Sequence, residues 1–135
     1  MDLQIYQREK EGIRILDLRG SLAIGESEAF LRQAVIALAD AGFVNVILNF
    51  AEVKEIEDDG LHALVFCSAK LVKSAGSLKL LNLGRVHIDL IVLTGLDASF
   101  DVFMNEQDAV NSFFPESAVR HFDILEFVKE NEKHS

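Results

Sequence analysis

The chain has 135 residues, half of them hydrophobic and 26% charged, with one proline and one cysteine. This composition fits one folded domain and excludes a disordered or collagen-like chain, an internal disulfide and a multi-cysteine zinc site. The net charge of −9 disfavours nucleic acid and anionic lipid as partners and favours basic proteins. No apolar run approaches the ~18 residues that span a bilayer, and the first residues lack a signal-peptide core, so we expect a cytoplasmic protein without membrane contact.

The N-terminal third predicts two strands, a helix and a third strand. Alternating apolar residues indicate strands at 3–6 and 13–18, and the polar turn at 9–12 between them predicts a hairpin. A helix follows at 25–42, because its apolar residues recur at helical spacing. The nearly continuous apolar run 44–50 is typical of a strand that is buried on both faces of a parallel sheet.

The middle of the chain predicts a polar loop and a second helix. The loop covers residues 51–57, and the helix begins near Asp58 and ends near Gly76. The residues we expect to form its inward stripe are Leu61, Leu64, Val65, Ser68, Leu71 and Val72.

Shorter elements complete the domain. The apolar pattern predicts a strand at 78–81, a helix at 86–93, a strand at 100–103 and a helix at 105–113. The resulting order, β-β-α-β-α-β-α-β-α, predicts a single α/β domain at residues 1–114, with right-handed crossovers and helices packed on a mixed sheet.

A separate segment follows the only proline of the chain, Pro115. Residues 115–135 combine apolar positions with a charged end, which indicates an amphipathic C-terminal extension. Three roles remain open for it. It packs on its own domain, it builds a homodimer with a neighbouring copy, or it docks another protein.

Three motifs stand in a defined order along the chain. They are Val-Ile-Leu-Asn-Phe-Ala-Glu-Val at 46–53, Ile-Glu-Asp-Asp-Gly-Leu at 56–61, and Leu-Thr-Gly-Leu-Asp at 93–97, followed by an acidic helix start at 105–109. Together they resemble the STAS domain of bacterial anti-sigma-factor antagonists. The resemblance covers about residues 1–114 and implies the same α/β fold.

The resemblance also implies a function in transcription control. Members of that family bind the ATPase-like domain of an anti-sigma factor and thereby release a sigma factor. The anti-sigma factor is also a kinase, which phosphorylates the first serine of an Asp-Ser-Ser-Gly-Leu signature and so ends the binding.

This chain departs from the family signature at the phosphoacceptor position. Glu57, Asp58 and Asp59 occupy the places of Asp-Ser-Ser, with Asp58 in place of the phosphorylated serine. The segment from Glu52 to Gly60 contains no serine, threonine or tyrosine. A serine kinase needs a hydroxyl nucleophile, so the usual switch cannot operate at this site.

The acidic segment has three open interpretations. Asp58 stands where its side chain can accept a backbone N–H bond as a helix N-cap, worth on the order of 1 kcal/mol. Alternatively, Asp58 and Asp59 imitate phosphoserine, which carries about −1.5 to −2 charges at pH 7. Thirdly, Asp58, Asp59 and His62 share a helical face and could hold a divalent ion. We give the metal the least weight and predict neither metal nor cofactor.

We predict a protein-binding surface around this acidic segment. Ser21 is included because the ends of parallel strands gather at one edge of a sheet. The resemblance implies an anti-sigma factor with a kinase-type ATPase domain, or a related regulator, as the partner. The candidate contact residues are Ser21, Lys54, Glu57, Asp58, Asp59, Gly60 and His62.

The sequence predicts no enzymatic activity. Cys67 reads as a small core residue of the second helix, and no histidine lies in the context of a catalytic triad. Two other functions remain open. One is a constitutively assembled subunit of a larger signalling or transport complex, and the other is a binder of a small molecule or nucleotide.

Overall fold

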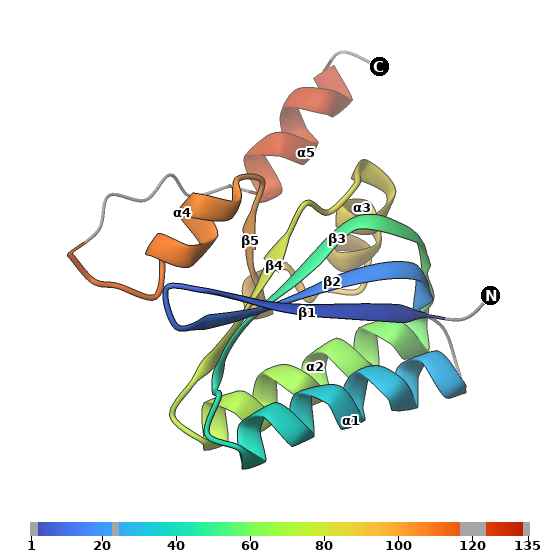
Figure 1. Ribbon diagram of the computed structural model, residues 1–135. Coiled ribbons are helices and arrows are strands. Elements are labelled where there is room, and N and C mark those ends of the chain that lie inside the picture. Colours follow the sequence, from blue (N-terminus) through green and yellow to red (C-terminus); the bar gives the residue numbers. More distant parts are fainter. Residues whose placement is uncertain (1–2, 23–24, 117–123, 134–135) are drawn as a thin grey trace.

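The computed structural model describes residues 3–22, 25–116 and 124–133, except the side-chain surroundings of Asp59, Glu126 and residues 130–133. A five-stranded mixed sheet forms its centre (Figure 1). The first two strands pair antiparallel and all other neighbours pair parallel, which confirms the predicted α/β class with a mixed sheet. In order across the sheet, the strands are β1 (Gln4–Lys10), β2 (Ile13–Leu22), β3 (Asn45–Ile56), β4 (Ser77–Leu81) and β5 (Asp101–Phe103).

Helices cover both faces of the sheet. α1 and α2 lie side by side on one face, whereas α4 lies on the opposite face (Figure 1). The order of elements through α4 confirms the predicted β-β-α-β-α-β-α-β-α order, with one 3-10 turn, η1 (Asp97–Ser99), added before β5. The helices are α1 (Glu26–Asp40), α2 (Asp58–Lys73), α3 (Arg85–Leu93), α4 (Glu106–Asn111) and α5 (Ile124–Lys133).

Alternating side chains of the central strands build two cores. In β3, Val46 and Leu48 belong to the main core that includes residues of α1, α2 and α3, while Ile47 belongs to a smaller core with residues of α4. All three side chains are fully buried. This confirms the prediction that the apolar run at 44–50 is buried on both faces of the sheet.

The predicted loop at 51–57 is wrong, because β3 continues to Ile56. The second half of β3 pairs with β2 from Arg19 opposite Glu52 to Leu22 opposite Ile56, with one register shift between Gly20 and Ser21. Only every third side chain is buried in this half, so the segment lacks the continuous apolar run that marks a central strand. β2 also extends to Leu22, beyond the predicted strand at 13–18, so Ser21 lies within the strand.

The predicted inward stripe of α2 is partly wrong. Leu61, Leu64 and Leu71 are buried as predicted, but Val65 is 39% exposed and Val72 is 61% exposed. The helix instead turns its small residues inward. Those fully buried small residues are Ala63 and Cys67, and for Cys67 this confirms the predicted core position.

The last helix packs on its own domain. Ile124 is buried in the main core, and Phe127 and Val128 pack against the same cluster. The Arg85 guanidinium of α3 lies 5.9 Å from the centre of the Phe127 ring. These contacts agree with the first of the three predicted roles of the extension. Residues 117–123, which also belong to the extension, lie outside the described residues.

Candidate functional site

The predicted contact residues meet where β3 passes into α2. We call residues 54–60 the acidic junction. Its backbone is held by the end of β2, because the Glu57 amide donates to the Leu22 carbonyl oxygen at 2.9 Å. The Leu61 amide then donates to the Glu57 carbonyl oxygen at 3.1 Å and starts the helix. The junction is therefore a fixed turn between two regular elements.

Gly60 allows this close approach of α2 to β2. A Cβ atom at Gly60 would lie 2.5 Å from the Leu22 carbonyl oxygen, closer than any side chain tolerates. Ser21 pairs with Glu55 in the sheet and is 8% exposed. The structure thus places Gly60 within the acidic junction and Ser21 beside it, and it buries both residues.

Asp58 does not cap α2, so the interpretation as an N-cap is wrong. The N-cap is Glu57, whose extended backbone (φ −95, ψ 169) precedes the first helical residue and whose side chain makes no capping hydrogen bond. Asp58 is the first residue of the helix and is exposed. Its negative charge still lies at the positive end of the helix dipole, an interaction worth roughly 0.3 to 1 kcal/mol.

The exposed charges of the acidic junction have no partners among the described side chains. Lys54, Glu55, Glu57 and Asp58 form no ion pair and no side-chain hydrogen bond with any other residue the structure describes. Lys54 contributes only its carbonyl oxygen, which lies 3.4 Å from Nε2 of His87. The junction therefore presents negative charge that the fold does not neutralise within the described ranges.

His62 is exposed and follows Asp58 by about one helical turn. Within the described side chains, no group of three histidine, cysteine, aspartate or glutamate residues could hold a metal ion. The metal interpretation also needs Asp59, whose backbone lies in α2 but whose side chain lies outside the described residues.

The structure has a groove beside the acidic junction that was not predicted from the sequence. We call it the α2 groove; its volume is about 580 Å³. Its walls come from α2 and from the turn that follows α3. The sequence does contain a signal for the groove, because α2 has more apolar residues than fit on the one helix face that packs against the core. The residues that line the groove are Asp58, Leu61, His62, Val65, Phe66, Thr94 and Leu96.

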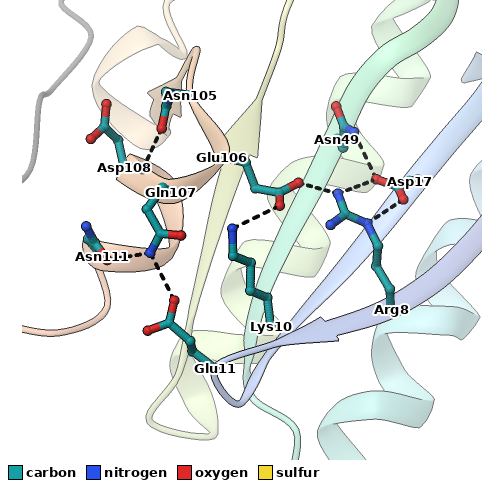
Figure 2. A network of polar contacts seen from close by, with 10 residues as sticks. All are labelled: Arg8, Lys10, Glu11, Asp17, Asn49, Asn105, Glu106, Gln107, Asp108 and Asn111. Carbon is teal, nitrogen blue, oxygen red and sulfur yellow. Dashed lines mark hydrogen bonds and ion pairs between the residues drawn. The ribbon is translucent and has the colours of Figure 1, made fainter.

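A second group of charged residues lies on the sheet face that α4 covers (Figure 2). Nε and one NH2 nitrogen of Arg8 donate to the two carboxylate oxygens of Asp17, at 2.7 and 3.1 Å. Arg8 also donates to Glu106 at the start of α4, and Lys10 lies 3.4 Å from the same carboxylate. The Asn49 amide donates to Asp17 at 2.8 Å. We call these five residues the Arg8 network, which joins α4 to the hairpin of β1 and β2.

Cys67 offers no nucleophile. The side chain is fully buried, and this burial raises the pKa of its thiol to about 12. Because the thiolate is the reactive form, the thiol is inert near neutral pH.

Comparisons with known proteins agree with this architecture. The family model of the STAS domain matches residues 4–109. An anti-sigma factor antagonist from Mycobacterium paratuberculosis superposes with a TM-score of 0.72 at 22% identity, over 82% of this chain and 93% of that chain. The phosphorylated form of SpoIIAA, a Bacillus cell fate determinant, gives 0.63 at 17% identity, over 82% and 99%.

A similar domain also occurs in a much larger protein. The murine anion transporter Slc26a9 matches with a TM-score of 0.64 at 24% identity, over 76% of this chain but 18% of the transporter. At these identities the structures establish a shared fold. No curated protein matches the chain. Within the described ranges, no helix of this chain is long and apolar enough to cross a bilayer.

Proposed function

The chain belongs to the STAS domain family, and we propose that it is a non-enzymatic protein-interaction module that works in the cytoplasm. Its partner is an anti-sigma factor with a kinase-type ATPase domain, or a related regulator of transcription. The acidic junction is the contact surface, with Lys54, Glu57, Asp58, Asp59 and His62 as its predicted contact residues.

The observation that carries this proposal is the state of the Asp58 carboxylate. It is exposed at the first position of α2, it caps nothing, and it has no ion-pair partner among the described residues. A charge that no described side chain neutralises is available to a partner protein. In the resemblance to the family signature, Asp58 occupies the position of the phosphorylated serine.

Asp58 and Asp59 together carry up to two negative charges, close to the value of phosphoserine. In antagonists with the serine signature, phosphorylation ends the binding to the anti-sigma factor. This chain would therefore stay permanently in a state that resembles the phosphorylated one. It would bind a kinase-type anti-sigma factor weakly, or prefer a regulator with a basic surface.

The test compares the parent with Asp58→Ser and with the double variant Asp58→Ser, Asp59→Ser. Each is incubated with labelled ATP and a purified kinase-type anti-sigma factor from the same organism, and binding is measured by calorimetry. We expect no label on the acidic junction of the parent. The double variant should accept label or bind at least about tenfold more tightly, a difference of ~1.4 kcal/mol.

Glu52→Ser is the matched control, because Glu52 is an exposed acid of the same strand that precedes the acidic junction. It should behave like the parent in both assays. Equal binding of the parent and the double variant to every regulator would show that the charge at Asp58 is not a switch element.

A second candidate function is a permanently assembled subunit of a larger complex, and the occurrence of the fold within Slc26a9 favours it. In this case the extension after Pro115 would be the docking element, directly or by forming a homodimer. Deleting residues 116–135 separates the two functions. Loss of assembly with intact binding at the acidic junction supports the subunit, whereas a change in binding that occurs only in Asp58 variants supports the regulator. Since Ile124 is part of the main core, the truncated chain needs a thermal unfolding control.

A further inference from the structure

The α2 groove has an apolar surface that nothing in the described part of the chain covers. Leu61 is buried at its floor, and Val65 and Phe66 are 39% and 38% exposed along α2. Leu96 closes the other side from the turn after α3. Leaving large apolar side chains in water is unfavourable, so such a surface marks a place for another apolar group.

The walls of the groove determine what shape of ligand fits. The Leu96 amide donates to the Ile91 carbonyl oxygen, and the Thr94 hydroxyl donates to the Leu90 and Ile91 carbonyl oxygens. α2 is helical from Asp58 to Lys73 and therefore presents no strand edge. With no free strand edge in either wall, a partner strand has nothing to pair with. The apolar side chains of α2 instead recur about one turn apart, which is the pattern that receives a helix.

The charges at the two ends of the groove differ, and this sets a direction. At one end, Asp58 has no ion-pair partner among the described residues. Near the other end, Arg32 lies 5.0 Å from the centre of the Phe66 ring and is paired with Glu28. The charge that remains to be neutralised is therefore negative and lies beside the start of α2.

A second copy of this chain does not supply the complementary charge. The net charge of −9 opposes self-association. The amphipathic helix α5 uses Ile124, Phe127 and Val128 against its own main core and has more acidic than basic residues in its sequence. The occupant is therefore a different protein with basic side chains.

We propose that the α2 groove receives an amphipathic helix of the partner protein, antiparallel to α2, with basic side chains in its last turn next to Asp58. In this direction the partner's cations lie at the negative end of its own helix dipole, where they are favoured. The inference rests on the proposed function, because it specifies the chemistry of the partner at the acidic junction. It adds an apolar contact and an orientation that the junction alone does not require.

The probe is a synthetic helical peptide of about four turns, with leucines along one face and three lysines in its last turn. Two control peptides have the same composition. One carries its lysines in the first turn, and the other has a scrambled order that destroys the apolar face. Binding to the full-length chain is measured by calorimetry, and its location by amide NMR shifts.

The groove variants are Val65→Ser and Asp58→Asn. Their matched controls are Val72→Ser, an exposed apolar residue of the same helix outside the groove, and Glu9→Gln, an exposed acid of β1. We expect the first peptide to bind at about micromolar affinity and each groove variant to weaken it about fivefold or more. The control variants should stay within about twofold of the parent, and both control peptides should bind about fivefold more weakly.

Three results would overturn the inference: no binding of the first peptide, shifts centred away from the α2 groove, or equal weakening by Val72→Ser. The proposed function fails separately. If a regulator binds in an Asp58-dependent way but Val65→Ser leaves its affinity unchanged, the groove inference is wrong and the proposed function stands. If no regulator depends on Asp58, the proposed function is wrong whatever the peptide does.

Discussion

The two acidic regions of the molecule differ in what their carboxylates contact. In the Arg8 network, Asp17 and Glu106 are both paired with the same guanidinium. In the acidic junction, Glu57 and Asp58 have no ion-pair partner among the described residues. The first arrangement joins α4 to the hairpin across 98 positions of sequence. The second joins nothing that the structure describes. Acidic residues that stabilise the fold can therefore be distinguished from acidic residues available for binding, because the former have ion-pair partners within the described chain.

The pairing changes the acidity of the network carboxylates. For Glu106, the hydrogen bond from Arg8 lowers the pKa of the carboxyl below its ordinary value. For Asp17, burial raises the pKa, but the hydrogen bonds from Arg8 and Asn49 outweigh it, so the net shift is downward. The same contacts raise the pKa of Arg8. The network is thus a set of mutually stabilised charges.

The largest loss of stability is expected when the close contact between Gly60 of the acidic junction and Leu22 of β2 is disturbed. Gly60→Ala places a Cβ atom against the Leu22 carbonyl oxygen, so the backbone must shift, and we expect a loss of about 2 to 4 kcal/mol in the free energy of unfolding. Urea denaturation measures it. Gly84→Ala is the matched control, since its Cβ would meet nothing closer than 3.9 Å, and it should cost less than about 1 kcal/mol. Equal losses would contradict the close contact.

The next effect tests the Arg8 network. Arg8→Met removes the donor of two carboxylates, and because these groups are partly exposed we expect a loss of about 1 to 2 kcal/mol in urea denaturation. Arg19→Met serves as control, because Arg19 is an exposed arginine of the same hairpin that lies near the Tyr6 ring and has no ion pair among the described residues. A loss as large in this control would mean that the ion pairs do not stabilise the fold.

Acid should weaken the same network. The folded-state pKa values of Asp17 and Glu106 lie below their ordinary values of 3.8 and 4.5, so their contribution to stability is complete above those values. It is lost progressively as the pH falls through and below that range. The parent should therefore lose more stability than Arg8→Met between about pH 6 and about pH 3 in urea titrations. Parallel pH profiles of the two proteins would refute this.

The smallest effect is expected at the acidic junction itself. Asp58→Asn removes a charge that has no ion-pair partner among the described residues, so only its interaction with the α2 dipole is lost and the free energy of unfolding should fall by no more than about 1 kcal/mol. Asp17→Asn makes the same chemical change in the Arg8 network and should cost more in the same assay. A loss at Asp58 as large as the loss at Asp17 would assign the junction charge to the fold.

Much of the fold was predictable because it depends on local patterns. The buried run at 44–50 and the order of motifs led to the correct α/β architecture, and the start of α2 was placed at the right residue. The second half of β3 was missed, since its pairing with β2 depends on residues more than 30 positions away. The rotation of α2 was missed because Cys67 and Ala63 pack inward in place of the larger Val65.

The site was predictable only in part, for a related reason. The acidic junction is contiguous in sequence, so its charges could be recognised there. The α2 groove joins residues of α2 to Thr94 and Leu96, and only the folded chain brings them together. The Arg8 network likewise has no local signal, because Arg8 meets Glu106 only after the sheet forms.

The hydrogen bond from Glu57 to Leu22 has a consequence for the thermodynamics of recognition. With the junction backbone already anchored to the sheet, little conformational entropy remains to be lost when a partner arrives. Discrimination among partners then depends on complementary charge and is sensitive to ionic strength, as expected of a rigid electrostatic template.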